Sequence, residues 1–237
     1  MNKIKPIFRL VGSKYRMLDW LFEKMKIEKY TKFIDLFGGT GIVGVNVKKS
    51  FKNIQTVLIN DFDNILEPLD IKHAVLSQVC FNGFGSVTER ALSFFSTKIN
   101  NGYFENIKAY KNVLKNCKVT HYEATDFLNR KKEYLKEHQN ELLIYMDIPY
   151  YDKKHKNSCF YKNKLNIDYF LEVITKLNED IPGLSMALSI DDSNQKVLNK
   201  LSHWTKHTKQ ISKVNASRSG VIKKGNEYLL IWGEKND

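Results

Sequence analysis

Four consecutive residues, Asp147-Ile148-Pro149-Tyr150, could hold a planar nitrogen base, and they directly follow the apolar run Leu142–Met146. The run shows no helical periodicity, so it predicts a buried parallel strand, and open α/β sheets handle ligands at the carboxyl ends of such strands. A carboxylate and the next backbone carbonyl can each accept a hydrogen bond from an exocyclic amine, proline stiffens the turn, and a tyrosine ring can stack on a base. The four residues could therefore hold a flipped nucleobase, although ordinary strand-to-loop turns use the same residue types.

A second candidate site is the glycine-rich segment Phe37–Gly41, which follows the short apolar strand Phe33–Leu36 and precedes a helical stretch. Glycines at this place let the backbone approach a ligand closely. No Gly-Lys-Ser/Thr follows, which excludes a phosphate loop, and the dinucleotide spacing G-x-G-x-x-G is only approached by Gly39, Gly41 and Gly44. The segment predicts a cofactor loop, and a nicotinamide-dependent enzyme stays open as an alternative.

Two further segments carry residues suited to a nucleoside-containing ligand. The strand predicted over Gln55–Asn60 ends at Asp61, and an acid at the tip of the second strand can accept hydrogen bonds from ribose hydroxyls. Near the amino terminus, a turn ending in Lys14 precedes an amphipathic helix with Leu18, Leu21, Phe22 and Met25 on one face. Such a turn can bring a cation and backbone donors to a carboxylate.

The charge distribution points to a polyanionic partner. The formal net charge is +12, residues 196–226 contain eight Lys or Arg and no acid, and residues 153–167 contain five Lys and no acid. Cations near phosphates gain from counterion release, so contacts with a polyanion are expected in both stretches, although a general excess of lysine also explains the total charge. The predicted contacts, which would be DNA-binding residues if the polyanion is DNA, are Lys153, Lys154, Lys156, Lys162 and Arg218.

Several classes of protein are disfavoured by what the sequence lacks. The three cysteines have no C-x-x-C spacing, so neither a disulfide framework nor a metal site is indicated. No apolar run approaches the roughly 20 residues of a spanning helix, and the amino terminus lacks a signal-peptide core, so we expect a cytoplasmic protein with no membrane contact. No proline precedes a cysteine, which disfavours methylation of the cytosine ring by a cysteine nucleophile, and the zinc deaminase pattern is missing.

These segments together resemble a known family. The residues Asp147–Tyr150 resemble the Asp-Pro-Pro-Tyr signature of amino-group DNA methyltransferases, and the chain is similar to the Dam-like (D12 class) DNA adenine methylases. Ile148 stands at the position of the usual first proline, where the implied role belongs to the backbone carbonyl. The resemblance implies S-adenosylmethionine as the cofactor and makes the catalytic residues Asp147, Ile148, Pro149 and Tyr150.

The resemblance also assigns the cofactor contacts. Lys14 matches a lysine that contacts the methionine part, Asp61 matches the ribose-binding acid, and Asp126 with Phe127 matches the pair that holds the adenine ring. Asp126 is equally suited to cap a helix. The full implied set is Leu10, at a position where the family often has tryptophan, with Lys14, Asp35, Phe37, Gly39, Gly41, Asp61, Asp126, Phe127 and Asp147.

The expected fold is an α/β protein with a seven-stranded mixed sheet of the S-adenosylmethionine-dependent methyltransferase type, Rossmann-like, with its last strand antiparallel. The catalytic domain is predicted to comprise residues 1–63 and 119–237, with a mostly helical target-recognition region inserted at 64–118. The predicted strands are 33–36, 55–60, 119–122, 142–146, 184–190, 206–213 and 227–232. The predicted helices lie near 18–25, from 42, and over 71–79, 88–99, 128–137 and 168–178.

The expected function is site-specific DNA adenine methylation, with direct transfer of the methyl group to the 6-amino group of a flipped adenine in duplex DNA by a monomer, as in restriction-modification systems. Three alternatives stay open: a catalytically silent DNA-binding relative, a nicotinamide-dependent oxidoreductase, and a methyltransferase that acts on RNA or on the cytosine amino group. The oxidoreductase does not explain the basic stretches.

Overall fold

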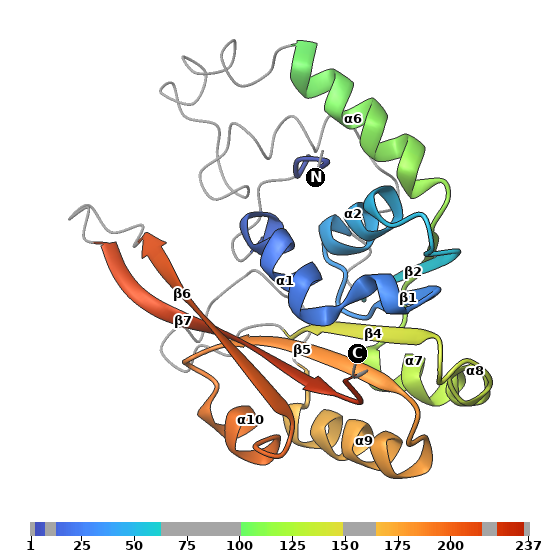
Figure 1. Ribbon diagram of the computed structural model, residues 1–237, viewed down its shortest axis with the longest axis vertical. Helices are drawn as coiled ribbons and strands as arrows, with labels where there is room; N and C mark the ends of the chain where they lie inside the picture. Colours follow the sequence, from blue (N-terminus) through green and yellow to red (C-terminus); the bar gives the residue numbers. More distant parts are fainter. Residues whose placement is uncertain (1–2, 8–12, 63–100, 149–164, 215–221, 235–237) are drawn as a thin grey trace.

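The computed structural model describes residues 3–7, 13–62, 101–148, 165–214 and 222–234 (Figure 1). Within these ranges, strands alternate with helices as predicted. The strands are β1 (Lys32–Asp35), β2 (Thr56–Asn60), β3 (Lys118–Thr120), β4 (Leu142–Asp147), β5 (Ser185–Asp191), β6 (Thr205–Val214) and β7 (Ile222–Trp232). The helices are η1 (Lys14–Met17), α1 (Leu18–Met25), η2 (Ile27–Lys29), α2 (Ile42–Ser50), α6 (Asn101–Leu114), α7 (Ala124–Arg130), α8 (Lys132–Glu137), α9 (Ile167–Asp180) and α10 (Gln195–Lys200).

The strands form one seven-stranded sheet in the order β3-β2-β1-β4-β5-β7-β6. Neighbours from β3 to β5 are parallel, whereas β7 is antiparallel to both β5 and β6. The mixed sheet with an antiparallel β7 inserted beside β5 confirms the expected methyltransferase type of α/β fold. β7 is longer than predicted, because its polar amino-terminal half pairs with β6.

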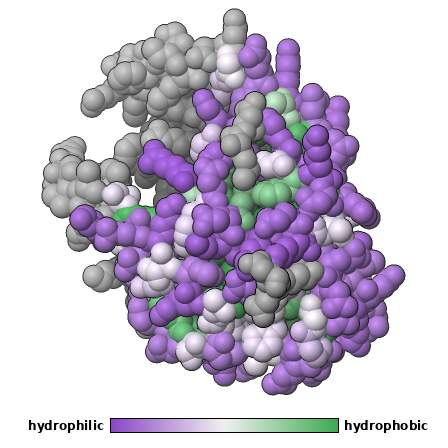
Figure 2. Space-filling view, in the orientation of Figure 1, coloured by the Kyte–Doolittle hydropathy of each residue, from purple (hydrophilic) through white to green (hydrophobic). Residues whose placement is uncertain are grey.

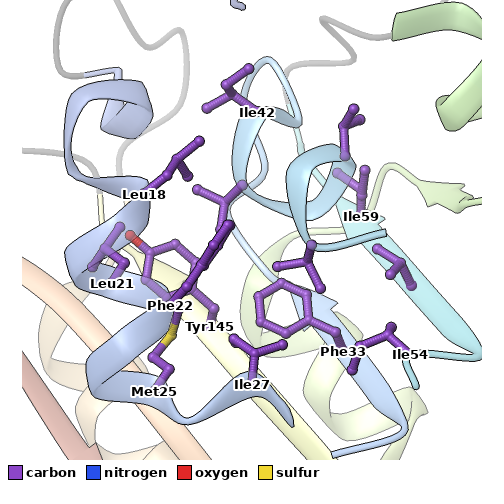
Figure 3. Packing of buried hydrophobic residues seen from close by; sticks show 14 of the residues in the cluster. Leu18, Leu21, Phe22, Met25, Ile27, Phe33, Ile42, Ile54, Ile59 and Tyr145 are labelled. Atoms are coloured by element: carbon purple, nitrogen blue, oxygen red, sulfur yellow. The ribbon is translucent and has the colours of Figure 1, made fainter. Parts of the chain in front are cut away.

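Helices cover both faces of the sheet, with α1, α2 and α6 on one side and α7, α8 and α9 on the other (Figure 1). Strand β4 is covered by helices on both faces, and its side chains alternate between two buried clusters. Leu143 and Tyr145 belong to one cluster, and Leu142, Ile144 and Met146 belong to the other. A strand buried on both faces needs a continuous apolar run without alternation. In the first cluster, the apolar side chains of α1 point toward the sheet, where the aromatic residues Phe33 and Tyr145 lie (Figure 3).

The amphipathic helix predicted near the amino terminus is α1, and its four predicted apolar residues are buried. Two helices were not predicted, α6 and α10. The single helix predicted over 128–137 is two helices, α7 and α8, and the helices predicted over 71–79 and 88–99 lie outside the described residues.

Helix α6 packs on the catalytic part of the chain. Tyr110 is fully buried and its hydroxyl donates to the backbone carbonyl of Thr40, while the Tyr103 hydroxyl donates to the carbonyl of Ile7. The insertion boundaries 64–118 stay a prediction, since most of that range lies outside the described residues.

The surface is mainly hydrophilic on the face shown in Figure 2. None of the described helices has the length and apolar character needed to cross a membrane. Likewise, the described His, Cys, Asp and Glu side chains form no group of three or more that could hold a metal ion.

Candidate active site

The candidate site lies where β1 and β4 run side by side at the centre of the sheet. From this pair, the chain continues to β2 and β3 on one side and to β5 on the other, which makes it the topological switch point of the sheet. Ligands of open α/β sheets bind outside the carboxyl ends of the strands at this point. Asp35 ends β1 and Asp147 ends β4, so both predicted acids lie at this edge.

The glycine-rich loop after β1 is fastened to the end of β2. The backbone amide of Gly38 donates to the carbonyl of Asn60 at 2.8 Å, and the amide of Gly39 donates to Oδ2 of Asp61 at 2.7 Å. Gly39 and Gly41 have φ angles of 52° and 67°, in the left-handed region that favours glycine. The predicted ribose acceptor therefore also holds the predicted cofactor loop in place.

The glycines differ in the space around them. A Cβ on Gly38 would collide with the Ile59 side chain, and one on Gly44 would come within 2.8 Å of it, so these two glycines allow close packing of the loop and α2 against β2. Apart from its two chain neighbours, no described residue has an atom within 4 Å of the position of a Cβ on Gly39. The loop therefore packs against β2 at Gly38, whereas its backbone is accessible at Gly39. An accessible backbone at this position is suited to contact a cofactor.

Asp35 is buried, 1% exposed, and its Oδ2 accepts a hydrogen bond from the amide of Gly44 at 3.0 Å. Burial raises the pKa of Asp35 to about 7, the Gly44 hydrogen bond opposes this, and the charges of Asp147 and Asp61 raise it further. Asp35 therefore joins β1 to the first turns of α2.

The Asp147 carboxylate belongs to a buried group of charges. Its Oδ1 lies 2.7 Å from Nζ of Lys14, a side chain that is only 2% exposed, and the same Nζ lies 3.3 Å from Oε1 of Glu227. The Ser189 hydroxyl lies 3.0 Å from Glu227 Oε1 and 3.4 Å from Asp147 Oδ1. Burial raises the pKa of both carboxyls, and the Lys14 ammonium opposes that rise.

The predicted adenine-holding pair is divided between two environments. Asp126 lies in the first turn of α7, whose cap is Glu123, and it pairs with Nε of Arg130 at 2.7 Å. Phe127 is fully buried in the core. Phe37 packs edge-to-face on Phe170 with the ring centroids 5.3 Å apart.

Ile148 is 3% exposed, and its side chain packs in the core cluster that contains Met146. Its position next to Asp147 is the one predicted to offer a carbonyl. The remaining predicted site residues lie outside the described residues: Leu10, Pro149, Tyr150, Lys153, Lys154, Lys156, Lys162 and Arg218.

Three polar residues of the site were not predicted: Asn60, Ser189 and Glu227. The buried Asn60 amide donates to the carbonyls of Leu36 and Tyr122 at 3.2 and 2.9 Å, so it joins the loops after β1 and β3. Asn60 and Ser189 are polar residues of otherwise apolar strands, a pattern that marks a buried polar group in need of a partner but does not specify which partner it meets.

Residues 11–69 match the model of the D12 class N6 adenine-specific DNA methyltransferase family. The matched segment contains Lys14, the glycine loop and Asp61. No curated protein matches the chain.

The following solved structures of similar fold are distant in sequence. The precorrin-6y C5,15-methyltransferase of Geobacter metallireducens is 10% identical, with 98% of this chain and 100% of that chain covered and a TM-score of 0.48. The C-terminal domain of the precorrin-6Y enzyme of Rhodobacter capsulatus is 11% identical, with 97% of each chain covered and a TM-score of 0.49. A putative RNA methyltransferase of Pyrococcus horikoshii is 12% identical, with 94% and 84% covered and a TM-score of 0.44.

The matched segment contains the glycine loop and the ends of β1 and β2, which form one part of the candidate site, and the sheet has the strand order expected for methyl transfer from a nucleoside cofactor. Together they identify the chain as a methyltransferase with S-adenosylmethionine as its cofactor, which matches the D12 class of N6 adenine-specific DNA methyltransferases over residues 11–69.

Proposed function

We propose that this protein methylates the 6-amino group of an adenine that has been flipped out of duplex DNA. The observation that carries the proposal is the Asp147 carboxylate at the end of β4, beside the glycine loop. Lys14 holds Oδ1, whereas no described residue bonds Oδ2, and the side chain is 23% exposed. Asp147 therefore offers one acceptor oxygen to a ligand amine at the edge where the family segment lies.

The reaction would need no protein nucleophile. S-adenosylmethionine, when bound, supplies an electrophilic methyl group on its sulfonium. Asp147 Oδ2 and the Ile148 carbonyl would accept hydrogen bonds from the target amine and stabilise the positive charge that develops on its nitrogen as the methyl–sulfur bond breaks and leaves a neutral thioether. The methylated nitrogen would then lose one proton to solvent. The Tyr150 ring would stack on the base. Orientation of the two reactants contributes up to ~7–11 kcal/mol to lowering such barriers.

The cofactor would lie over the open backbone at Gly39. Asp61 would accept from the ribose hydroxyls, and Asp126, with 45% of its side chain exposed, would face the adenine end. The Lys14 ammonium forms ion pairs with Asp147 and Glu227. We therefore propose that Lys14 affects binding of the methionine part of the cofactor partly by holding these two carboxylates in position.

The outer strands offer a basic surface for DNA. The last pair between β5 and β7 is Asp191 with Glu227, but pairing between β6 and β7 continues to Val214 with Ile222. The two strands thus extend beyond the carboxyl edge of the sheet as an arm, residues 210–214 and 222–226 (Figure 1). The arm contains no acid and carries Lys213, Lys223 and Lys224. The register of the two strands places the backbone of Lys213 opposite that of Lys223.

The substrate is tested by incubating the protein with labelled S-adenosylmethionine and, separately, duplex DNA, RNA and no nucleic acid, followed by nucleoside mass spectrometry. We expect N6-methyladenine in DNA. Methylcytosine or label confined to RNA would replace the proposed substrate, and DNA binding without any transfer would show a catalytically silent relative.

The DNA surface is tested by the salt dependence of binding. Replacing Lys153, Lys154 and Lys156 by alanine should weaken binding to all sequences alike and flatten the slope of log affinity against log salt by up to about three units. The triple variant of Lys213, Lys223 and Lys224 should behave in the same way. A control triple with the same charge change, Lys132, Lys136 and Lys176 on α8 and α9, should leave the slope unchanged.

A further inference from the structure

Glu227 is an unusual residue for the interior of a sheet. It lies in β7, paired with Asp191 of β5 and Lys209 of β6, and it is only 1% exposed. Burial of a carboxylate is costly unless hydrogen bonds and an opposite charge accompany it. Here the Ser189 hydroxyl lies at 3.0 Å and the Lys14 ammonium at 3.3 Å from its Oε1. Both of these partners also contact Asp147 Oδ1, so Glu227 shares them with the proposed acceptor.

The two ion pairs of Lys14, with Asp147 and with Glu227, fix the position of its ammonium group. A lysine ammonium on a flexible stem can swing around a single carboxylate, whereas contact with two carboxylates determines its position. With the ammonium and the Ser189 hydroxyl both on Oδ1 of Asp147, the second oxygen of that carboxylate is left for a ligand.

The presence of a second carboxylate beside Lys14 also determines the net charge of the site. Lys14 and Asp147 alone would be neutral as a pair, and a neutral pair gives little stabilisation to an amine that becomes positive. A second carboxylate makes the group of three formally negative when both acids are ionised, and a negative group held in place favours the developing cation.

We propose that Glu227 is a positioning residue for methyl transfer, which anchors Lys14 on Oδ1 of Asp147 and keeps the group net negative. This inference rests on the proposed function for its kinetic consequence. Its structural content, the control of the ionisation of Asp147 by Glu227, concerns the protein alone.

The surroundings of the group support the inference. Burial raises the pKa of Glu227, Lys14 opposes the rise, and the charge of Asp147 adds to it. The Lys14 ammonium acts on both carboxyls, the charge of Asp147 also raises the pKa of Asp35 and of Tyr145, and the Ser189 hydroxyl contacts both carboxylates. The substitution Glu227→Gln removes a negative charge near Asp147, and Lys14 then has its ion pair with Asp147 but not with residue 227. Both changes favour the ionised form of Asp147, so its pKa should fall.

The test compares the wild type with Glu227→Gln without cofactor, by NMR titration of ¹³C-labelled aspartate carboxyls. The Asp147 signal is assigned by its loss in Asp147→Asn. The titration midpoint of Asp147 should fall by about one pH unit or more in Glu227→Gln. Glu234→Gln, a carboxylate-to-amide change just after the far end of β7, serves as the control and should leave the midpoint unchanged.

Kinetics supply the second measurement. In Glu227→Gln, kcat should fall at least about tenfold with a smaller change in KM, and Glu227→Asp, which keeps the charge, should recover part of the loss. If Glu227→Gln does not fold, Glu227→Asp takes its place in the titration, because the shorter side chain moves the carboxylate away from Lys14 and should also shift the Asp147 midpoint.

An Asp147 midpoint that is equal in wild type and variant overturns the inference, and so does an unchanged kcat in an active enzyme. If the wild type methylates no nucleic acid, the proposed function fails, and the titration alone then decides whether Glu227 controls Asp147.

Discussion

The backbone amide of Gly39 donates a hydrogen bond to Oδ2 of Asp61, with 2.7 Å between the two atoms. This bond ties the loop after β1 to the end of β2 and gives Asp61 a structural role besides the proposed contact with ribose. Asp61→Ala should therefore weaken S-adenosylmethionine and its demethylated product alike, by about 10- to 100-fold, since hydrogen bonds to charged groups contribute roughly 1.5–3 kcal/mol. Calorimetry measures both affinities. Asp19→Ala, which removes an exposed acid from α1, is the control, and equal affinity in both variants would contradict the assignment.

Gly38 and Gly39 should respond differently to the same substitution. Gly38→Ala places a methyl group against the Ile59 side chain and 3.3 Å from the Asn60 carbonyl, so it should destabilise the fold by about 1–3 kcal/mol. Gly39→Ala meets only open space and the strain of a positive φ, about 1–2 kcal/mol, but it obstructs the proposed cofactor surface. Denaturant unfolding and calorimetry on both variants separate the two effects. A Gly39→Ala variant with full cofactor affinity would place the cofactor elsewhere.

Asp147→Ala should abolish methyl transfer, with a loss of at least about 10³-fold, because the acceptor for the target amine is removed. Cofactor binding should stay measurable, since Lys14 keeps Glu227 as a partner at 3.3 Å. Asp147→Asn retains an acceptor oxygen without charge and should leave a trace of activity. The measurements are single-turnover methyl transfer and calorimetry; transfer by Asp147→Ala at the wild-type rate would be incompatible with the proposed site.

Ile148→Pro introduces the residue usual in the family that the sequence resembles and tests whether only the carbonyl matters. The rate of methyl transfer should be retained or should rise, because proline stiffens the turn. The buried position of the isoleucine side chain adds a second expectation, a lower thermal midpoint from lost packing. Ile148→Val, which keeps most of the apolar volume and the carbonyl, is the control and should change both quantities little. Loss of transfer in a folded Ile148→Pro variant would show that the side chain itself is needed.

Asp35 should make the stability of the fold depend on pH. Its pKa of about 7 in the folded protein lies above the ordinary 3.8, so the folded state binds more protons between these values. The free energy of unfolding contributed by this carboxyl is therefore fully present below pH 3.8 and decreases as the pH rises to about 7. Asp35→Asn keeps an acceptor for the Gly44 amide but cannot ionise, so relative to wild type it should gain up to about 4 kcal/mol between pH 4 and 8. Denaturant unfolding at several pH values measures this, and parallel curves would contradict it.

The sequence was sufficient for the strands and for the acids at their carboxyl ends, because both are local patterns. An apolar run such as Leu142–Met146 indicates a strand covered on both faces, and the first polar residue after it marks the edge of the sheet. Helix α6 was missed because Tyr103 and Tyr110, on its buried side, satisfy their hydroxyls with backbone carbonyls. Aromatic residues with polar tips dilute the apolar periodicity on which helix prediction depends.

Glu227 and Ser189 could not be assigned to the site from the sequence. Their meeting with Asp147 depends on the register of β7 against β5 and of β5 against β4. That register brings together residues far apart in the chain, and no local pattern specifies it.

The group formed by Lys14, Asp147 and Glu227 also has a consequence for biosynthesis. Lys14 comes from the first helical turn of the described chain, Asp147 from a central strand and Glu227 from the last strand. During translation, the earlier strands can pair and α1 can pack before β7 has left the ribosome, since chains fold from the amino terminus as they are made. Until then the Lys14 ammonium lacks its contact with Glu227, and the charge of the proposed acceptor is complete only when β7 has entered the sheet between β5 and β6. The proposed acceptor group therefore becomes net negative only after synthesis of the chain has passed Glu227.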